Sequence, residues 1–215
     1  MRKVFQAEMA SLQDGLIELA ELVEKSFTKA TKAFSKSDVE MAEFVIEADN
    51  KIDAAAVEID ELAIEILARQ SPVARDLRTV VSALRISASL ERMGDMAEHI
   101  AELARLRYPE KVAPKALKDT FTMMGDANKE IVRMLVELLR TQDLNVANTI
   151  RDKDDLIDEL HVSVFDTVLS SNWQHSAATT VDATLISRYH ERFADHAVSI
   201  AKKVIYLATG EWERK

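Results

Sequence analysis

Apolar residues recur every three or four positions along most of the chain, which is the spacing of one face of an α-helix. The first such stretch runs from Val4 to about Phe34. A second helix follows, and Ser37 with Glu40 three residues later predicts a capping box at its start. Its apolar stripe repeats every seven residues, as in the seam of a helical bundle. The stripe consists of Val45, Ile52, Ile59 and Ile66.

The third predicted helix runs from about Pro72 to Arg107, and Ser71 before the proline predicts an N-cap. One stripe on this helix is apolar throughout and predicts a face in the core: Ala83, Ile86, Leu90, Met93, Ala97, Ile100 and Ala104. A second stripe begins apolar and then turns acidic without a change of period, at Glu91, Asp95, Glu98 and Glu102. Carboxylates that continue an apolar row need a partner, because an ordinary solvated face would not share that row.

The segment from Tyr108 to Pro114 contains two of the three prolines and predicts a boundary between two halves, residues 1–108 and 114–215. A fourth helix extends to about Thr141, and Asp143 is expected to cap a fifth. A break at 170–176 precedes a sixth helix, for which Gly210 is the expected C-cap. Two sets of three helices predict an all-α fold of two tandem three-helix bundles.

One motif occurs twice. The segment Glu91–Asp95 reads Glu-Arg-Met-Gly-Asp, and Glu191–Asp195, 100 positions later, reads Glu-Arg-Phe-Ala-Asp. The two carboxylates of each copy are four residues apart and lie on one helix face, roughly 6 Å apart. Each copy is preceded by an acidic pair of the same spacing: Asp49 and Asp53 in the first half, Asp154 and Asp158 in the second.

The spacing places these pairs level with each other across each predicted hairpin. In two antiparallel helices, residues equidistant from the connecting turn lie side by side. The midpoint between the pairs of the first half is Pro72, in the predicted turn, and that of the second half is at 174–175, in the predicted break. We therefore expect two clusters of four carboxylates. These are Asp49, Asp53, Glu91 and Asp95, and Asp154, Asp158, Glu191 and Asp195.

Clustered carboxylates repel one another unless positive charge lies among them. Oxygen donors suit hard cations such as magnesium, calcium, manganese and ferric iron, so the eight acids predict metal sites. Arginines, or protons and water, could take the same place. Gly94 and Ala194 leave room for an ion or for close packing of a neighbouring helix.

Arginines form a basic row on the third helix, partly repeated on the sixth. They are expected to pair with a neighbouring helix, and the alternative is a docking surface for an acidic partner or an anion. The residues concerned are Arg78, Arg85, Arg92, Arg188 and Arg192.

Composition narrows the class of function. The chain has 215 residues, no cysteine and a net charge of -9, which excludes thiolate metal sites and argues against binding to nucleic acid or to an anionic membrane surface. No apolar run approaches the ~18–20 residues of a membrane span, and the N-terminus lacks the apolar core of a signal peptide, so we expect a cytoplasmic protein. A ferritin-like di-iron enzyme needs Glu-x-x-His on two helices, and Asp158–His161 is the only near match.

On these motifs the chain resembles the PhoU family of phosphate-transport accessory proteins over essentially its whole length. The matching stretches are Asp49–Asp53, Ser71–Arg78, Glu91–Asp95, Asp154–Asp158 and Glu191–Asp195. The second Glu-Arg copy departs from the family pattern, with Phe-Ala where an aliphatic residue and glycine are usual. The resemblance implies two bundles related by a pseudo-twofold axis, each able to carry a metal cluster on its acids. Iron or zinc is expected, with manganese or magnesium as alternatives.

The resemblance also implies a role. Such a protein is a non-enzymatic, cytoplasmic regulator of phosphate uptake and of the phosphate-starvation response. It bridges the ATPase subunit of a phosphate ABC transporter and a membrane sensor histidine kinase, and reaches the membrane through these partners. We also expect a homodimer. A metal-independent adaptor, whose acids dock basic partner surfaces, stays open as the alternative, and a carboxylate-bridged oxidase is the least favoured one.

Overall fold

The computed structural model describes residues 2–211, and this part of the chain contains six long helices and no strand, as the all-α prediction requires. The helices are α1 (Arg2–Lys36), α2 (Val39–Gln70), α3 (Ala74–Arg107), α4 (Lys118–Thr141), α5 (Leu144–Val168) and α6 (Ala177–Thr209). A 3-10 turn, η1 (Lys115–Leu117), precedes α4. None of the helices in 2–211 has the length and hydrophobicity that crossing a membrane requires.

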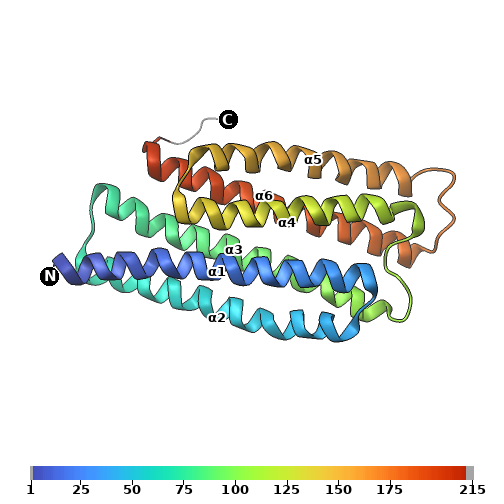
Figure 1. Ribbon diagram of the computed structural model, residues 1–215, viewed down its shortest axis with the longest axis horizontal. Helices are drawn as coiled ribbons and strands as arrows, with labels where there is room; N and C mark the ends of the chain where they lie inside the picture. Colours follow the sequence, from blue (N-terminus) through green and yellow to red (C-terminus); the bar gives the residue numbers. More distant parts are fainter. Residues whose placement is uncertain (1, 212–215) are drawn as a thin grey trace.

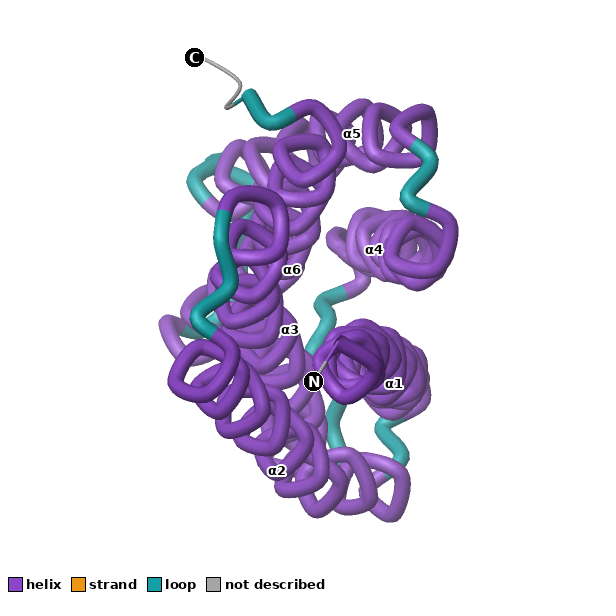
Figure 2. The backbone as a smooth tube through the Cα atoms, turned by 90° about the vertical axis from the view of Figure 1, so that its left-hand side faces the viewer, coloured by secondary structure: helices purple, strands orange, loops and turns teal. Residues whose placement is uncertain are grey.

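The six helices lie side by side along one long axis (Figure 1). Helices α1, α2 and α3 pack against one another, as do α4, α5 and α6. The two sets meet where α3 packs on α6 and α1 packs on α4. Seen end-on, α2, α3, α6 and α5 form a curved layer, and α1 and α4 fill its concave side (Figure 2). The outer seams of this layer are therefore α2–α3 and α5–α6.

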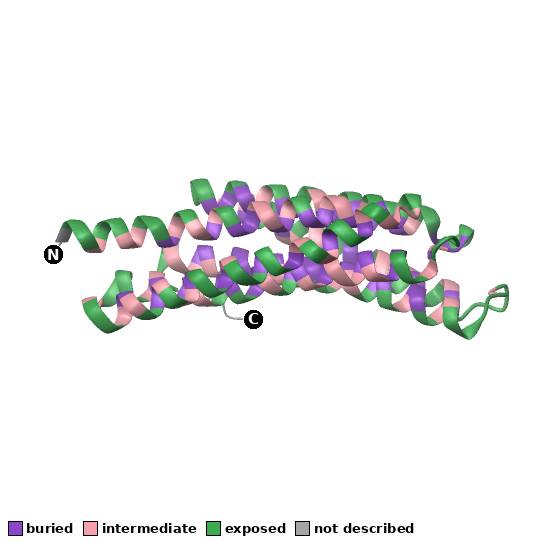
Figure 3. Cartoon of the chain, turned by 90° about the horizontal axis from the view of Figure 1, so that it is seen from below, coloured by how far each residue is buried: buried purple, intermediate pink, exposed green. Residues whose placement is uncertain are grey.

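The predicted stripes form the core. All four residues of the seven-residue stripe on α2 and all seven of the apolar row on α3 are buried. Buried and exposed positions alternate along every helix with the helical period (Figure 3). Two aromatic side chains, Phe27 of α1 and Phe193 of α6, meet in the centre with ring centroids 4.0 Å apart. Burial of each such side chain contributes about 1.5–3 kcal/mol to the stability of the fold. This burial holds the helices together, because few specific links join them.

Two of the four predicted caps are wrong. Asp38, one residue after the predicted Ser37, caps α2 by accepting a hydrogen bond from Met41 N at 3.0 Å. Ser37 itself has a positive φ of 53° and serves the turn. Ser71 does not begin α3 but ends α2 with a φ of 45°, and α3 begins at Ala74. At both sites the turn between the helices uses the serine that the cap pattern predicts as the start of the next helix.

The other two caps are confirmed. The side chain of Asp143 accepts a hydrogen bond from Asn145 N at 2.9 Å at the start of α5. Gly210 ends α6 with a φ of 78°, and its N–H donates to Tyr206 O at 2.8 Å. A left-handed conformation of this kind favours glycine, because other residues meet a steric penalty there.

One ion pair joins the two halves at the end of α3. Arg107 donates from Nε to Asp182 Oδ2 at 2.6 Å and from a terminal nitrogen to Oδ1 at 3.0 Å. The side chain of Asp182, on α6, is only 8% exposed. A bidentate pair to a nearly buried carboxylate fixes the relative position of the two helices as well as their distance.

Candidate metal centres

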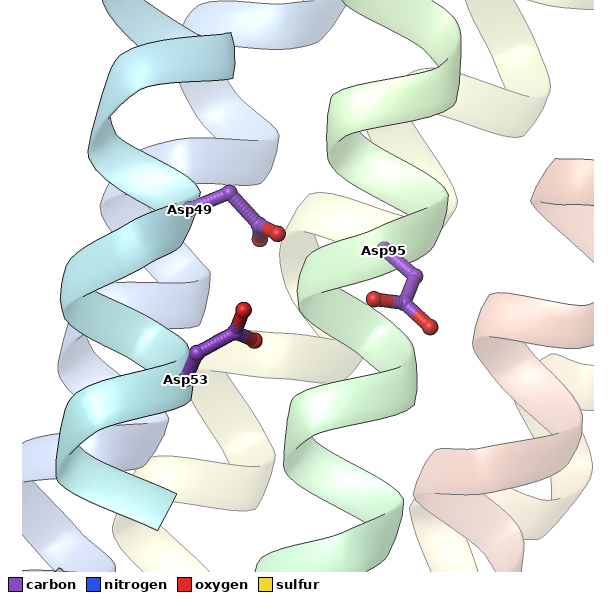
Figure 4. A group of neighbouring side chains, drawn as sticks. All are labelled: Asp49, Asp53 and Asp95. Carbon is purple, nitrogen blue, oxygen red and sulfur yellow. The ribbon is translucent and has the colours of Figure 1, made fainter. Parts of the chain in front are cut away.

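Three of the four acids predicted for the first cluster come together at the seam of α2 and α3 (Figure 4). Asp49 and Asp53 lie one turn apart on α2, and Asp95 faces them from α3. Each offers a carboxylate oxygen, and these oxygens lie within 4.8 Å of one another. One cation could contact all three, so the hairpin register places the donors as a metal site requires.

Gly94 allows the two helices to approach closely at this point. A Cβ atom on Gly94 would lie 2.9 Å from Ile52 Cγ2 and 3.0 Å from Asp49 Oδ1. Both distances are shorter than ordinary van der Waals contact, so any side chain here would push α2 away or displace the carboxylate. Of the two roles that the sequence left open for this small residue, close packing of a helix is the one that the geometry shows.

Asp49 is a buried carboxylate, and one of its oxygens has no hydrogen-bond donor within residues 2–211 to replace the water lost on burial. It is 7% exposed, and its Oδ1 has no hydrogen-bond partner among the described residues. Burial raises the pKa of Asp49 to about 7, and repulsion from Glu98, Asp53, Asp95 and Glu91 adds to the rise. A bound cation would remove both penalties, because it replaces the lost hydration and neutralises the neighbours.

Glu98 of α3 adds negative charge to this cluster, and the acid pairs of the sequence motifs do not include it. It is the acid whose charge acts most strongly on Asp49. Its own pKa is raised by burial first and then by repulsion from Glu102. The signal that could have identified it is its position in the acidic row of α3, three residues after Asp95.

The second cluster, at the seam of α5 and α6, is similar in charge and looser in geometry. Burial raises the pKa of Asp154 to about 7, followed by repulsion from Asp158, Asp195, Asp155 and Glu191. Asp154 Oδ1 and Glu191 Oε2 are buried and lack hydrogen-bond partners in the described structure. Within residues 2–211, however, no three acids of this cluster have oxygens within 4.8 Å of one another, as the acids at α2–α3 do.

Arg92 and Arg188 pair within their own helices and not, as expected, with a neighbouring one. Arg92 donates to Asp95 Oδ2 at 2.8 Å, three residues along α3. Arg188 donates to Glu191 Oε1 at 2.5 Å, three residues along α6. Each arginine therefore holds one acid of its cluster in place and competes with a cation for it.

The other arginines of the predicted docking surface have different surroundings. Arg78 is half-buried, with its Cζ 6.0 Å from the centre of the Tyr206 ring on α6. Arg85 and Arg192 are exposed. The four predicted docking residues, Arg78, Arg85, Arg92 and Arg192, thus do not share one environment.

Histidines do not complete either cluster in the described chain. His161, which follows Asp158 by three residues, instead lies with Nδ1 2.6 Å from Ser187 Oγ. His190 is buried beside Asn128. The donor set is therefore all oxygen, which fits hard cations and supplies none of the nitrogen ligands of a ferritin-like di-iron site.

Comparison with known proteins shows which family this chain is similar to. The PhoU domain model matches residues 16–104 and 121–204. The phosphate-specific transport system accessory protein PhoU homolog 1 of Mycobacterium leprae is 38% identical over 99% of this chain and 96% of its own length. PhoU homolog 2 of Mycobacterium tuberculosis is 38% identical over 98% and 99%, respectively.

Two crystal structures match the fold. The phosphate transport system regulatory protein PhoU from Streptococcus pneumoniae superposes with a TM-score of 0.87 at 27% identity, covering 98% of this chain and 100% of its own. PhoU from Pseudomonas aeruginosa gives a TM-score of 0.88 at 27% identity, covering 96% of this chain and 100% of its own. The similarity extends over both sets of three helices.

Proposed function

This chain belongs to the PhoU family, and we propose that it is a non-enzymatic regulator of phosphate uptake, acting as an accessory protein of a phosphate transporter. The support is similarity over nearly the full length to relatives named as accessory proteins of the phosphate-specific transport system. The finer proposal is an adaptor that binds the ATPase subunit of the transporter and a sensor histidine kinase. Cytoplasmic location, a homodimer and an indirect, negative effect on transcription belong to the same proposal.

The acidic cluster at α2–α3 is the observation that carries the mechanism. Its oxygens converge, and one of them, on Asp49, is buried without a partner. Asp49, Asp53 and Asp95 would hold a cation, with Glu91 nearby, and the second cluster would do so with Asp154, Asp158, Glu191 and Asp195. A bound metal supplies positive charge to the seam. With that charge balanced, α2 and α3 present a fixed surface to a partner when phosphate is plentiful.

The donor set bears on the identity of the metal. We propose iron or zinc, with manganese or magnesium as alternatives. Carboxylate oxygens alone fit ferric iron, manganese and magnesium well, whereas structural zinc sites are usually built from cysteine and histidine. Iron is therefore the first metal to seek.

Elemental analysis tests the metal proposal. The protein, purified untagged and without chelator, is compared with Asp49→Asn/Asp53→Asn and with Glu58→Gln/Glu61→Gln, which changes two exposed acids on the same helix by the same charge. We expect bound metal to fall in the first variant and to stay unchanged in the second. Equal metal content in all three proteins would remove the α2–α3 cluster from consideration as a metal site.

Partner binding tests the adaptor proposal separately. The transporter ATPase and the kinase are presented to the same three proteins, and binding is measured with and without added metal. Loss of capture in Asp49→Asn/Asp53→Asn alone would support metal-dependent docking. Capture by metal-free wild-type protein would instead support the alternative, a metal-independent adaptor, which the ion pair between Arg92 and Asp95 favours. Failure of the wild-type protein to bind either partner would refute the adaptor role.

A further inference from the structure

A cavity of about 450 Å³ lies between α1 and α4, and none of the eight predicted metal-site acids lines it. Its walls come from the last turns of α1, the first half of α4 and the segment that joins α3 to α4. This segment crosses from one set of helices to the other at the end of the molecule where α1 finishes (Figure 1). The cavity is therefore built from both halves of the chain, and its volume is in the range that holds a small molecule.

Positive charge surrounds the cavity. Five of its lining residues are lysines: Lys32, Lys111, Lys115, Lys118 and Lys129. The only acid in the lining, Asp126, pairs with Lys129 at 2.6 Å. The other four lysines form no ion pair within 4.0 Å in the described part of the chain. In a protein with a net charge of -9, such a concentration of unpaired lysines attracts an anion to this cavity.

The interior of the cavity is apolar. Phe34 and Phe121 line it and pack edge to face, with ring centroids 5.8 Å apart. His190, from α6, lines it as well and is 1% exposed. Burial lowers the pKa of His190 to about 3, so the imidazole is neutral at physiological pH. An anion that entered would therefore meet positive charge only from the lysines.

Asn128 holds His190 in place beside the cavity. Asn128 Nδ2 donates to His190 O at 2.9 Å and lies 3.3 Å from Nδ1. Because the amide nitrogen donates, Nδ1 is the acceptor and Nε2 carries the proton. The adjoining edge of the ring faces Gly125, where an added Cβ would lie 3.9 Å from Cε1.

We propose that this cavity binds a small phosphorylated molecule with an apolar body, the class to which nucleotides belong. The lysines at its rim hold the phosphates, and the apolar body packs on Phe34 and Phe121 beside His190. Inorganic phosphate alone would occupy a small part of 450 Å³ and would leave the aromatic interior unused. The proposal does not depend on the metal sites or on the adaptor role. Since the ligand would contact both halves, its binding would stabilise the whole chain.

Calorimetric titration with ATP, AMP and inorganic phosphate tests this site. The buffer contains EDTA, so that no metal on the acidic clusters can bind the phosphates. The cavity variant is Lys111→Gln/Lys115→Gln/Lys118→Gln. The control, Lys3→Gln/Lys25→Gln/Lys202→Gln, removes the same charge from exposed lysines elsewhere. A third variant, Thr122→Trp, fills the cavity from an exposed position of α4 without changing charge.

We expect the wild-type and control proteins to bind a nucleotide saturably and more tightly than inorganic phosphate. The lysine variant should bind roughly tenfold or more weakly, because charge-assisted hydrogen bonds are lost, and Thr122→Trp should also bind weakly. Three results would overturn the proposal: no saturable binding of either nucleotide, equal weakening in the cavity and control variants, or inorganic phosphate binding as tightly as ATP. All these substitutions are at exposed residues, so the variants should fold, which circular dichroism verifies.

Discussion

Asp49 combines two features that are unfavourable for the folded protein and favourable for a metal site. Its carboxylate is buried, and four other acids act on it. A group whose pKa rises from 3.8 to about 7 on folding binds its proton more tightly in the folded state. Stability of the metal-free protein must therefore fall as pH rises between these values, and the full penalty is present above pH 7.

Replacing Asp49 by asparagine should accordingly stabilise the metal-free protein. At pH 8 we expect a gain of about 1–3 kcal/mol in the free energy of unfolding, and a much smaller gain at pH 4, where the carboxyl is protonated in the folded state and about half protonated in the unfolded chain. Urea unfolding in EDTA measures this, with the exposed Glu47→Gln on the same helix as the control. With metal added, the order should reverse, since only the wild-type protein binds it fully. An equal effect at pH 4 and pH 8 would show that charge is not the cause.

His190 should have the opposite dependence on pH. Its folded pKa is about 3 and its unfolded value is 6.5, so the unfolded chain binds more protons between them. Stability is therefore lost as pH falls through this range, by up to about 1.4 kcal/mol per pH unit. Acids whose pKa is raised, such as Asp49, change stability in the opposite direction over part of this pH range. The quantity to measure is therefore the difference in stability between the wild-type protein and a variant at His190.

Urea midpoints of wild-type protein and His190→Gln, taken from pH 4 to pH 7, isolate this contribution. The advantage of the wild-type protein should shrink steadily below pH 6.5. His175→Gln, in the exposed segment between α5 and α6, serves as the control and should follow the wild-type curve. A constant difference between wild type and His190→Gln across the range would mean that His190 does not stay neutral in the folded state.

Among the elements, the α2–α3 hairpin depends on one glycine. Gly94→Ala places a Cβ 2.9 Å from Ile52, and the resulting strain of about 1–3 kcal/mol outweighs the gain of about 1 kcal/mol in helix propensity. Gly125→Ala, in the interior of α4, meets nothing closer than 3.4 Å and should gain about 1 kcal/mol. Thermal unfolding of the two variants should thus shift in opposite directions. Stabilisation by Gly94→Ala would contradict the close approach of the helices.

The sequence predicts elements well where the pattern is local or repeated. Helical periodicity gives the six helices and their buried stripes, and equidistance from Pro72 brings Asp49 level with Asp95. Caps depend on how the chain reverses, and periodicity carries no information about that. The cap pattern therefore predicts the wrong role for Ser37 and Ser71.

Contacts between distant elements escape such patterns. Arg107 and Asp182 are 75 residues apart and belong to no motif. The lysines of the cavity come from α1, α4 and the segment before α4, so only the packing of α1 on α4 brings them together. Neither feature has a spacing in the sequence that would indicate it.

At the scale of the whole molecule, the two acidic clusters occupy separate seams. One lies at α2–α3 and the other at α5–α6, with the contact between α3 and α6 between them (Figure 2). Because the clusters share no residue, metal binding at one should not require the other. Glu91→Gln/Asp95→Asn and Glu191→Gln/Asp195→Asn should each lose about half of the bound metal, as elemental analysis can show. Complete loss in either variant would indicate that the two sites are coupled.

The ion pair between Arg107 and Asp182 joins the two halves, as do the pairs of Arg133 with Glu24 and of Arg140 with Glu21, and we expect it to contribute to their unfolding together. Arg107→Met leaves the carboxylate of Asp182 nearly buried and without its cation. This lowers the stability of the protein more than removing both charges does. The double variant Arg107→Met/Asp182→Asn should therefore be more stable than Arg107→Met alone.

Two probes can follow this unfolding, because both tryptophans of the chain lie after residue 114. Tryptophan fluorescence reports on the second half, and circular dichroism reports on all six helices. In wild-type protein the two urea transitions should coincide, and in Arg107→Met they should separate, with the circular dichroism change extending over a wider range of urea. Coincident transitions in Arg107→Met would mean that the packing of α3 on α6 and of α1 on α4 couples the halves without the ion pair.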